Sequence, residues 1–250
     1  MLYSVMMLES ISIVLPLYNE ENRLKNLFSE IIKQKIFKKK NIEFIFVNDG
    51  SNDLSLKLIK DFKSKNKNKI NTILVNYKKN RGKGYAVKRG VLISKKKWIL
   101  TMDIDLSVRL NQLEIWKNKK YIIKNTYVYF GSRLLNNSKV SSKKYRAFTG
   151  KLFNIILNII FDRKKLGVKD TQCGFKLYKN FIAKKIFNES HETGYIQDVE
   201  ILLLLIKKGI LIKELPVVWV HKTGSKVNVL FDSILMFCNL IKLKLKIFRV

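Results

Sequence analysis

The sequence is poor in the residues that cross-link or stiffen a chain. It has only two cysteines and two prolines among 250 residues. The cysteines, Cys173 and Cys238, are too few for a disulfide framework, and their spacing is not that of a metal site. We therefore expect a protein of a reducing compartment, by default the cytosol.

Long hydrophobic runs are also missing. No stretch reaches the roughly 18 uninterrupted apolar residues of a membrane-spanning helix. The nearest candidates, residues 152–161 and 229–241, are interrupted by polar residues and look amphipathic. Residues 1–10 do not combine a basic segment with a long apolar core, so we expect no signal peptide. Neither a GxGxxG fingerprint nor a Walker-type loop occurs, which argues against a dinucleotide dehydrogenase or a P-loop NTPase.

Acidic residues are scarce. The chain has 19 acidic and 50 basic residues, which gives a net charge of +31 and indicates an anionic partner such as a phosphorylated substrate, an acidic membrane or a nucleic acid. Only 8 of the basic residues are arginine, and the abundance of lysine, isoleucine and asparagine could equally reflect an AT-rich genome. Each arginine is therefore the more informative, because arginine is preferred for bidentate phosphate binding.

The order of strand-like and helix-like segments predicts the fold class. Hydrophobic residues make up 47% of the chain, which is enough for one large α/β domain. Strands are predicted at residues 11–15, 42–47, 70–75 and 98–102, and helices at 20–33, 52–62 and 84–93. This alternation predicts a mainly parallel sheet with helices on both faces. The alternation weakens past residue 130, where we expect helices at 148–161, 196–207 and 229–247 and a strand at 211–220.

Two aspartates, Asp103 and Asp105, close the fourth predicted strand. Side chains two residues apart on extended backbone project to the same side, and two such carboxylates repel each other unless a cation lies between them. Mg²⁺ bound to a diphosphate would supply that cation. The alternative is an aspartate-rich turn with no ligand. Residues 16–20 and 48–51 also follow strand ends, and ligands of parallel sheets bind beyond the carboxyl ends of the strands.

The ordered motifs support a family resemblance. The motifs are Leu-Pro-Leu-Tyr-Asn-Glu at 15–20, Val-Asn-Asp-Gly-Ser at 47–51, Asn-Arg-Gly-Lys-Gly at 80–84 and Met-Asp-Ile-Asp at 102–105. This set resembles the family 2 glycosyltransferases of the GT-A fold. Further motifs at 131–133, 170–176, 197–200 and 224–227 are similar to those of dolichyl-phosphate β-glucosyltransferases and, more broadly, of polyprenyl-phosphate glycosyltransferases such as dolichyl-phosphate mannose synthases. The resemblance covers about residues 11–229.

The resemblance implies roles on the donor side. Asp103 and Asp105 would hold Mg²⁺ or Mn²⁺ on the donor diphosphate, with Asp105 the more direct ligand and Asp103 also touching the nucleotide. The remaining nucleotide-sugar contacts would come from Pro16, Tyr18, Glu20, Asp49, Lys83 and Ile104. Asp49 would bind the nucleobase, with an acid at the start of the helix at 52–62 as the alternative. Lys83 would reach the phosphates, with a solvated lysine as the alternative. Ser107 departs from the pattern, since mannose synthases often have Gln there.

A polyprenyl phosphate acceptor changes what the enzyme must do. The phosphate is already anionic at neutral pH, so positioning and charge neutralisation replace proton removal as the main tasks. Arg133 and Arg146 are the expected phosphate-binding residues, with Lys226 assisting, and surface solvation is the alternative. Asp198 falls where GT-A enzymes often keep a catalytic acid, and with a phosphate acceptor it could instead order the acceptor loop.

These inferences predict an inverting transfer of glucose from UDP-glucose to a polyprenyl or dolichyl phosphate. The alternatives are a GDP-mannose-dependent enzyme and a soluble saccharide or protein acceptor, while nucleic-acid binding rests on charge alone and is not expected. We expect a GT-A domain at 1–226, with a nucleotide-sugar half at about 9–130 and an acceptor half at about 131–226. Residues 227–250 would be an amphipathic segment, and the protein would attach peripherally to the cytoplasmic face of a membrane. Eukaryotic glucosyltransferases of this type carry an N-terminal membrane helix, which we do not find here.

Overall fold

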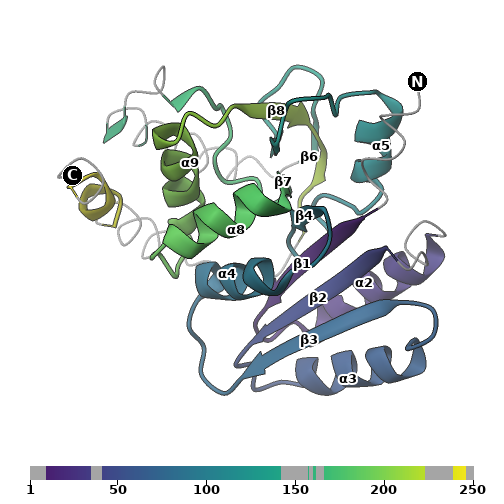
Figure 1. The fold of residues 1–250 in the computed structure, drawn as a ribbon. Helices are drawn as coiled ribbons and strands as arrows, with labels where there is room; N and C mark the ends of the chain where they lie inside the picture. Colours follow the sequence, from purple (N-terminus) through teal and green to yellow (C-terminus); the bar gives the residue numbers. More distant parts are fainter. Residues whose placement is uncertain are drawn as a thin grey trace.

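A seven-stranded sheet forms the centre of the molecule. The computed structural model describes residues 10–34, 41–141, 157, 160–161, 166–222 and 239–245. Across the sheet the strands are β3 (Asn71–Tyr77), β2 (Ile42–Asp49), β1 (Ile11–Leu17), β4 (Trp98–Thr101), β7 (Lys176–Lys179), β5 (Val128–Ser132) and β8 (Ile212–Pro216) (Figure 1). Only β7 runs antiparallel to its neighbours, β4 and β5, so the other six strands of this sheet share one direction. The predicted mainly parallel sheet is confirmed.

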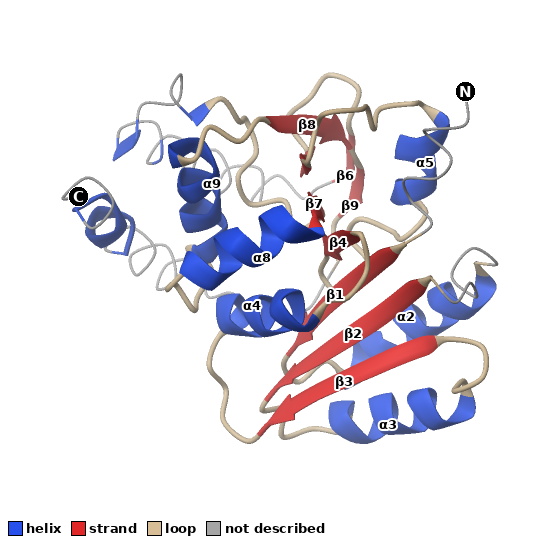
Figure 2. Ribbon diagram, in the orientation of Figure 1, coloured by secondary structure: helices blue, strands red, loops and turns tan. Residues whose placement is uncertain are grey.

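Helices cover both faces of the sheet, as predicted (Figure 2). One face carries α2 (Glu21–Lys33), α3 (Ser55–Lys65) and α5 (Gln112–Asn118), and the other carries α4 (Lys83–Ile93), α8 (Asn180–Glu189) and α9 (Gln197–Lys207). The buried side chains accordingly form two clusters, one on each face. Within β1, Ile13 and Leu15 belong to the first cluster and Val14 to the second, because successive side chains of a strand point to opposite faces. Strands buried on both faces explain why the strand segments read as continuous apolar runs.

The second half differs from the sequence prediction at residues 211–220 and in several elements that were not predicted. The single strand predicted at 211–220 is wrong, because β8 ends at Pro216 and the chain then forms β9 (Val218–Val220). β9 leaves the main sheet and pairs in parallel with β6 (Lys139–Ser141). The change of partner occurs at Val217, whose carbonyl accepts a hydrogen bond from the Lys139 N–H at 3.0 Å. The sequence analysis did not predict α5, β5, β6, β7 or α8.

The predicted C-terminal amphipathic segment is described only at residues 239–245, which are helical. Leu240 and Leu243 are buried in the second apolar cluster, whereas Ile241 and Leu245 are 40% and 52% exposed. Most of the predicted helices at 148–161 and 229–247 lies outside the described residues, and Leu157, Ile160 and Phe161 belong to the same cluster. None of the helices in the described ranges is long and apolar enough to cross a membrane.

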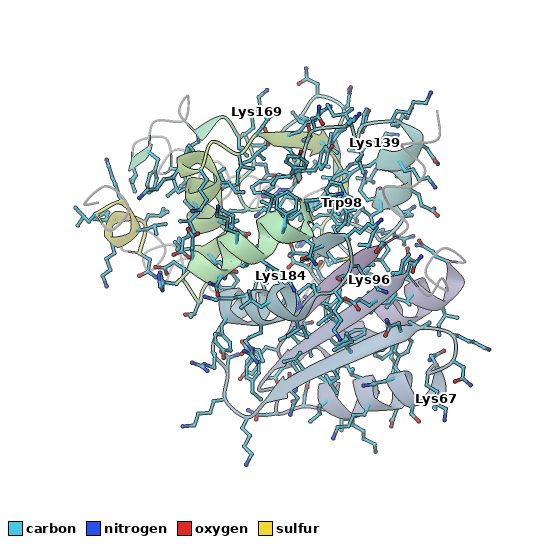
Figure 3. The ribbon with its side chains drawn as sticks, in the orientation of Figure 1. Lys67, Lys96, Trp98, Lys139, Lys169 and Lys184 are labelled. Carbon is cyan, nitrogen blue, oxygen red and sulfur yellow. The ribbon has the colours of Figure 1, made fainter. Side chains whose placement is uncertain are left out.

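The high positive charge is spread over the molecule. Among the labelled side chains in Figure 3, Lys67 lies near α3, whereas Lys139 and Lys169 lie at the opposite end of the molecule, near β6 and β8. Lys184 comes from α8, between these two ends. The charge of the chain therefore does not by itself indicate one binding surface.

The close approach of α4 to the sheet depends on Gly90. A methyl group on Gly90 would lie 3.0 Å from Val47 Cγ2 and closer still to Val14. We expect Gly90→Ala to lower the free energy of unfolding by about 1–2 kcal/mol, because overpacking outweighs the gain in helix propensity. Urea denaturation measures this. Gly194→Ala is the control, since no atom lies within 4 Å of its added methyl group. Equal stability of the two variants would contradict the packing argument.

Candidate active site

A cavity of about 560 Å³ opens at the carboxyl ends of β1, β2, β4 and β5. Most of the residues that the sequence analysis selected line it: Pro16, Tyr18, Glu20, Asp49, Lys83, Asp103, Ile104, Asp105 and Arg133. They come from four strand ends and from the start of α4. The expected convergence of the loops at 16–20, 48–51 and 103–105 on one edge of the sheet is confirmed.

The loops after β1 and β2 are tied together by hydrogen bonds. Asn19 adopts a left-handed conformation with φ of 53°. Its side-chain Oδ1 accepts the Asn52 N–H and its own N–H donates to Ser51 Oγ, both at 2.8 Å. The Glu20 N–H donates to Ser55 Oγ, also at 2.8 Å. These bonds fix the wall formed by residues 16–20 relative to Asp49.

Asp49 is buried and holds the loop that precedes α4. Its two carboxylate oxygens accept the backbone N–H groups of Arg81 and Gly82 at 2.8 and 2.9 Å. The alternative role at the start of the helix after β2 is wrong, because α3 begins only at Ser55 and has no acidic residue in its first turn. Burial, together with the nearby Asp49 carboxylate, raises the pKa of the Tyr77 hydroxyl well above its ordinary value.

Asp103 forms an ion pair with Lys83. The distance from Lys83 Nζ to Asp103 Oδ1 is 2.5 Å, and the two side chains are 35% and 40% exposed. Burial opposes ionisation of Asp103, but Lys83 outweighs it and lowers the pKa of the carboxyl. Lys83 is therefore a partly exposed lysine that pairs with a carboxylate of the cavity. The backbone of Gly174 lies against this carboxylate, since a methyl group there would be 2.8 Å from Asp103 Cγ.

Asp105 lies in a tight turn at the same strand end. Its Oδ1 accepts the Ser107 N–H at 2.8 Å, and Leu106 between them has φ of 56°. Among the residues that the structure describes, no three His, Cys, Asp or Glu side chains form a group that could hold a metal ion. A cation at Asp103 and Asp105 would thus need further ligands from a substrate. That donor set fits Mg²⁺ or Mn²⁺, which proteins commonly bind through one or two carboxylates together with phosphate and water oxygens.

Arg133 follows β5 and is held by Asp170. Its Nε and Nη2 donate to the two carboxylate oxygens at 2.7 and 2.8 Å, and its backbone N–H also donates to Asp170 at 2.9 Å. Asp170 is buried, so the pair fixes the guanidinium where it lines the cavity. Gly131 permits the close approach of the chain, because a methyl group there would be 2.8 Å from the Phe175 carbonyl oxygen.

Asp198, in the first turn of α9, pairs with Lys176 of β7. The Lys176 side chain is only 1% exposed, whereas that of Asp198 is 32% exposed. Lys176 Nζ also donates to the Thr171 carbonyl oxygen at 2.9 Å and lies 4.8 Å from the centre of the Phe130 ring. The Asp198 carboxylate is therefore bound to a fixed buried cation.

The start of α9 also connects the two halves of the chain. The Glu200 carboxylate accepts the N–H groups of His191 and Glu192 at 2.9–3.0 Å. The loop that it holds contacts the start of α4, where the Tyr85 N–H donates to the Thr193 carbonyl oxygen at 3.1 Å. The second half thus takes part in positioning Lys83.

Comparison with known proteins assigns the family. The model of the family described as Glycosyl transferase family 2 matches residues 12–187. The chain belongs to glycosyl transferase family 2. Curated relatives include the dolichyl-phosphate β-glucosyltransferases of Dictyostelium discoideum, with 34% identity over 94% of this chain and 74% of that protein, and of Homo sapiens, with 30% identity over 95% and 76%. One from Trichomonas vaginalis is 31% identical over 88% of this chain and 68% of its own length.

Solved structures confirm the GT-A fold of this glycosyltransferase. Glucosyl-3-phosphoglycerate synthase from Mycobacterium tuberculosis, in complex with Mn²⁺, UDP and glucosyl-3-phosphoglycerate, superposes with a TM-score of 0.68 at 17% identity, covering 95% of this chain and 79% of that one. A second mycobacterial protein gives a TM-score of 0.70 at 15% identity, covering 95% and 74%.

Two predicted phosphate-binding residues of the glycosyltransferase, Arg146 and Lys226, lie outside the described residues. The cavity is also lined by residues that the sequence analysis did not select, among them Arg23, Gln172, Tyr195, Trp219 and Lys222. Gln172 belongs to the motif at 170–176 and could have been found there. Cys173 is buried in the core, and burial raises the pKa of its thiol to about 12.

The Lys176–Asp198 pair yields a stability test. Asp198→Ala should lower the free energy of unfolding by about 3 kcal/mol, because it leaves a buried ammonium without its carboxylate. Adding Lys176→Met to that variant should restore most of the loss, since no unpaired charge then remains. Urea denaturation of the natural protein, Asp198→Ala, Lys176→Met and the double variant measures these changes in the free energy of unfolding. Additive losses in the double variant would show that the two charges do not depend on each other.

Proposed function

We propose that this glycosyltransferase transfers glucose from UDP-glucose to a polyprenyl phosphate of the dolichyl type, with inversion at the anomeric carbon. The observation that carries the proposal is that Arg133 lines the same cavity as Asp103 and Asp105. A pair of carboxylates that would bind a cation and an arginine that would bind a phosphate thus line one cavity. The relatives named as dolichyl-phosphate β-glucosyltransferases match most of the chain and supply the identity of the sugar and acceptor.

The donor would bind at the ends of β1, β2 and β4. Pro16, Tyr18, Asp49 and Ile104 line this part of the cavity and would surround the nucleoside. Glu20, oriented by two 3.0 Å hydrogen bonds from Arg23 Nη1, would accept a ribose hydroxyl.

Asp103 and Asp105 would hold Mg²⁺ or Mn²⁺. The ion would neutralise the charge that develops on the departing diphosphate. Lys83, already ionised beside Asp103, would add a further positive charge next to the phosphates.

The acceptor side requires orientation and needs no proton removal. A prenyl phosphate oxygen is anionic at neutral pH and can attack the anomeric carbon directly. Asp170 fixes Arg133 through two parallel hydrogen bonds, so the guanidinium has little freedom to lose when it binds a phosphate. We assign to Asp198 the ordering of the site, because its carboxylate is bound by Lys176. Arg146 and Lys226 remain predicted phosphate ligands.

A lipid acceptor also implies contact with a membrane surface. In the helical residues 239–245, Ile241 and Leu245 are exposed beside the exposed Lys242 and Lys244. Apolar and basic side chains in this arrangement suit the headgroup region of an anionic bilayer. We propose peripheral attachment to the cytoplasmic leaflet, with Leu240 and Leu243 joining the segment to the protein core.

The donor and the reaction can be tested together. Purified protein incubated with dolichyl phosphate and labelled UDP-glucose should yield an organic-extractable glucolipid, whereas GDP-mannose should not. We expect Asp105→Ala to lower kcat/KM at least about 10³-fold, the scale of losing a charge-stabilising group in the transition state. Circular dichroism checks its folding. Full activity in EDTA would contradict the metal assignment, and equal use of GDP-mannose would contradict the donor.

The acceptor role of Arg133 is tested by a substitution that keeps the charge. Arg133→Lys loses the paired hydrogen bonds to Asp170 and the forked geometry that suits phosphate. We expect KM for dolichyl phosphate to rise roughly tenfold, the scale of one good charged hydrogen bond. KM for UDP-glucose should change little, and Lys208→Arg on the surface of the protein serves as the control. An equal loss for donor and acceptor would reject the assignment.

A further inference from the structure

We propose that the Lys83 ammonium occupies the cation position on Asp103 before the donor binds, and that it moves toward Asp198 when the donor's divalent ion takes that position. The proposal rests on the donor site described above and deepens it. It assigns to Asp198 a positioning role that acts through Lys83 on the donor half of the cavity.

The first step of the argument is that Asp103 is confined. The backbone of Gly174 lies against its carboxylate, and a methyl group on Gly174 would be 2.8 Å from Cγ and 3.0 Å from Oδ1. The carboxylate cannot shift in that direction to accommodate two cations. If a divalent ion binds Oδ1, the group that must leave is the ammonium now 2.5 Å away.

The second step is that only the side chain of Lys83 is free to move. A methyl group on Gly82 would be 2.5 Å from the Thr193 carbonyl oxygen, and one on Gly84 would be 2.8 Å from the Gly194 carbonyl oxygen. The backbone on either side of Lys83 is therefore packed against the loop before α9. The side chain has four flexible carbons and is 35% exposed, so its ammonium can be displaced without moving α4.

The third step is that a second carboxylate, that of Asp198, lies on the chain segment that packs against Lys83. A methyl group on Gly84, the residue after Lys83, would be 2.9 Å from Cβ of Gln197, the residue before Asp198. Burial lowers the pKa of the Lys83 ammonium, but the charges of Asp103 and then Asp198 raise it above its ordinary value. Asp198 in turn pairs with the buried Lys176. The order Asp103, Lys83, Asp198, Lys176 is thus a row of alternating charges, which runs from the cavity to the interior. Lys176 holds the Asp198 carboxylate in place, so that it can receive the ammonium when Lys83 leaves Asp103.

A double-mutant cycle on metal binding tests the proposal. Mn²⁺ binding to the full chain in the presence of a constant concentration of UDP is measured by titration calorimetry for the natural protein, Lys83→Gln, Asp198→Asn and the double variant. Lys83→Gln should tighten Mn²⁺ binding roughly fivefold, the scale of a partly exposed ion pair. Asp198→Asn should weaken binding, because displaced Lys83 then has no carboxylate to receive it. In the Lys83→Gln background, Asp198→Asn should have no effect.

This last comparison separates movement of Lys83 from simple charge repulsion. If only the net charge of the cavity mattered, Asp198→Asn would weaken Mn²⁺ binding by the same factor in both backgrounds, and the proposal would be overturned. Lys208→Gln is the matched control, because Lys208 forms a 2.8 Å ion pair with Glu189 and has a similar exposure. It should leave Mn²⁺ affinity unchanged.

Three further results bear on the proposal. If Asp198→Asn fails to fold, the combination of Asp198→Asn and Lys176→Met replaces it. This combination should weaken Mn²⁺ binding when Lys83 is present and should have no effect in the Lys83→Gln background. If the natural protein binds no Mn²⁺ with or without UDP, the assignment of a metal-dependent donor site is wrong, and so is the proposed role of Lys83. If the natural protein binds Mn²⁺ but Lys83→Gln leaves the affinity unchanged, only the counter-ion role is wrong.

Discussion

The site depends on one electrostatic constraint, the gathering of carboxylates at one edge of the sheet. Five of the nine aspartates in the chain lie in this region: Asp49, Asp103, Asp105, Asp170 and Asp198. Like charges brought this close destabilise the fold unless each has a fixed partner. Backbone N–H groups donate hydrogen bonds to Asp49 and Asp105. Asp103, Asp170 and Asp198 each pair with a lysine or an arginine. The loops around the cavity must therefore place a backbone N–H group or a basic side chain next to each of these carboxylates.

This constraint explains why charged residues and glycines occur together in the motifs. Gly82 is next to Lys83, Gly131 is two residues before Arg133, and Gly174 is two residues before Lys176. At each of these glycines a methyl group would collide with backbone or with a site carboxylate. The glycine lets two chain segments approach closely enough for the neighbouring charged side chain to meet its partner.

The parts of the structure that the sequence predicted are those that depend on local pattern. The first four strands and three helices follow from apolar runs and helical spacing, and their bounds differ by only a few residues. The convergence of Asp49, Asp103 and Asp105 on one edge follows from parallel topology alone. What the sequence could not predict is pairing across the fold. Lys83 and Asp103 are 20 residues apart, and Lys176 and Asp198 are 22 apart, so no periodicity connects them. The antiparallel β7, which brings Lys176 beneath α9, depends in the same way on tertiary contacts.

The halves that the sequence suggested as separate in function are joined at α4. The Asp49 carboxylate holds the chain just before α4 begins, and the loop held by Glu200 packs against the same point from the other side. The backbone of Lys83 lies between them, so residues of both halves hold it in place. A glycosyltransferase must bring its donor and its acceptor to one point, and reaction geometry tolerates little displacement. The backbone at Lys83 is held both by Asp49 and by the loop before α9, which keeps residues from the two halves at fixed positions around one cavity.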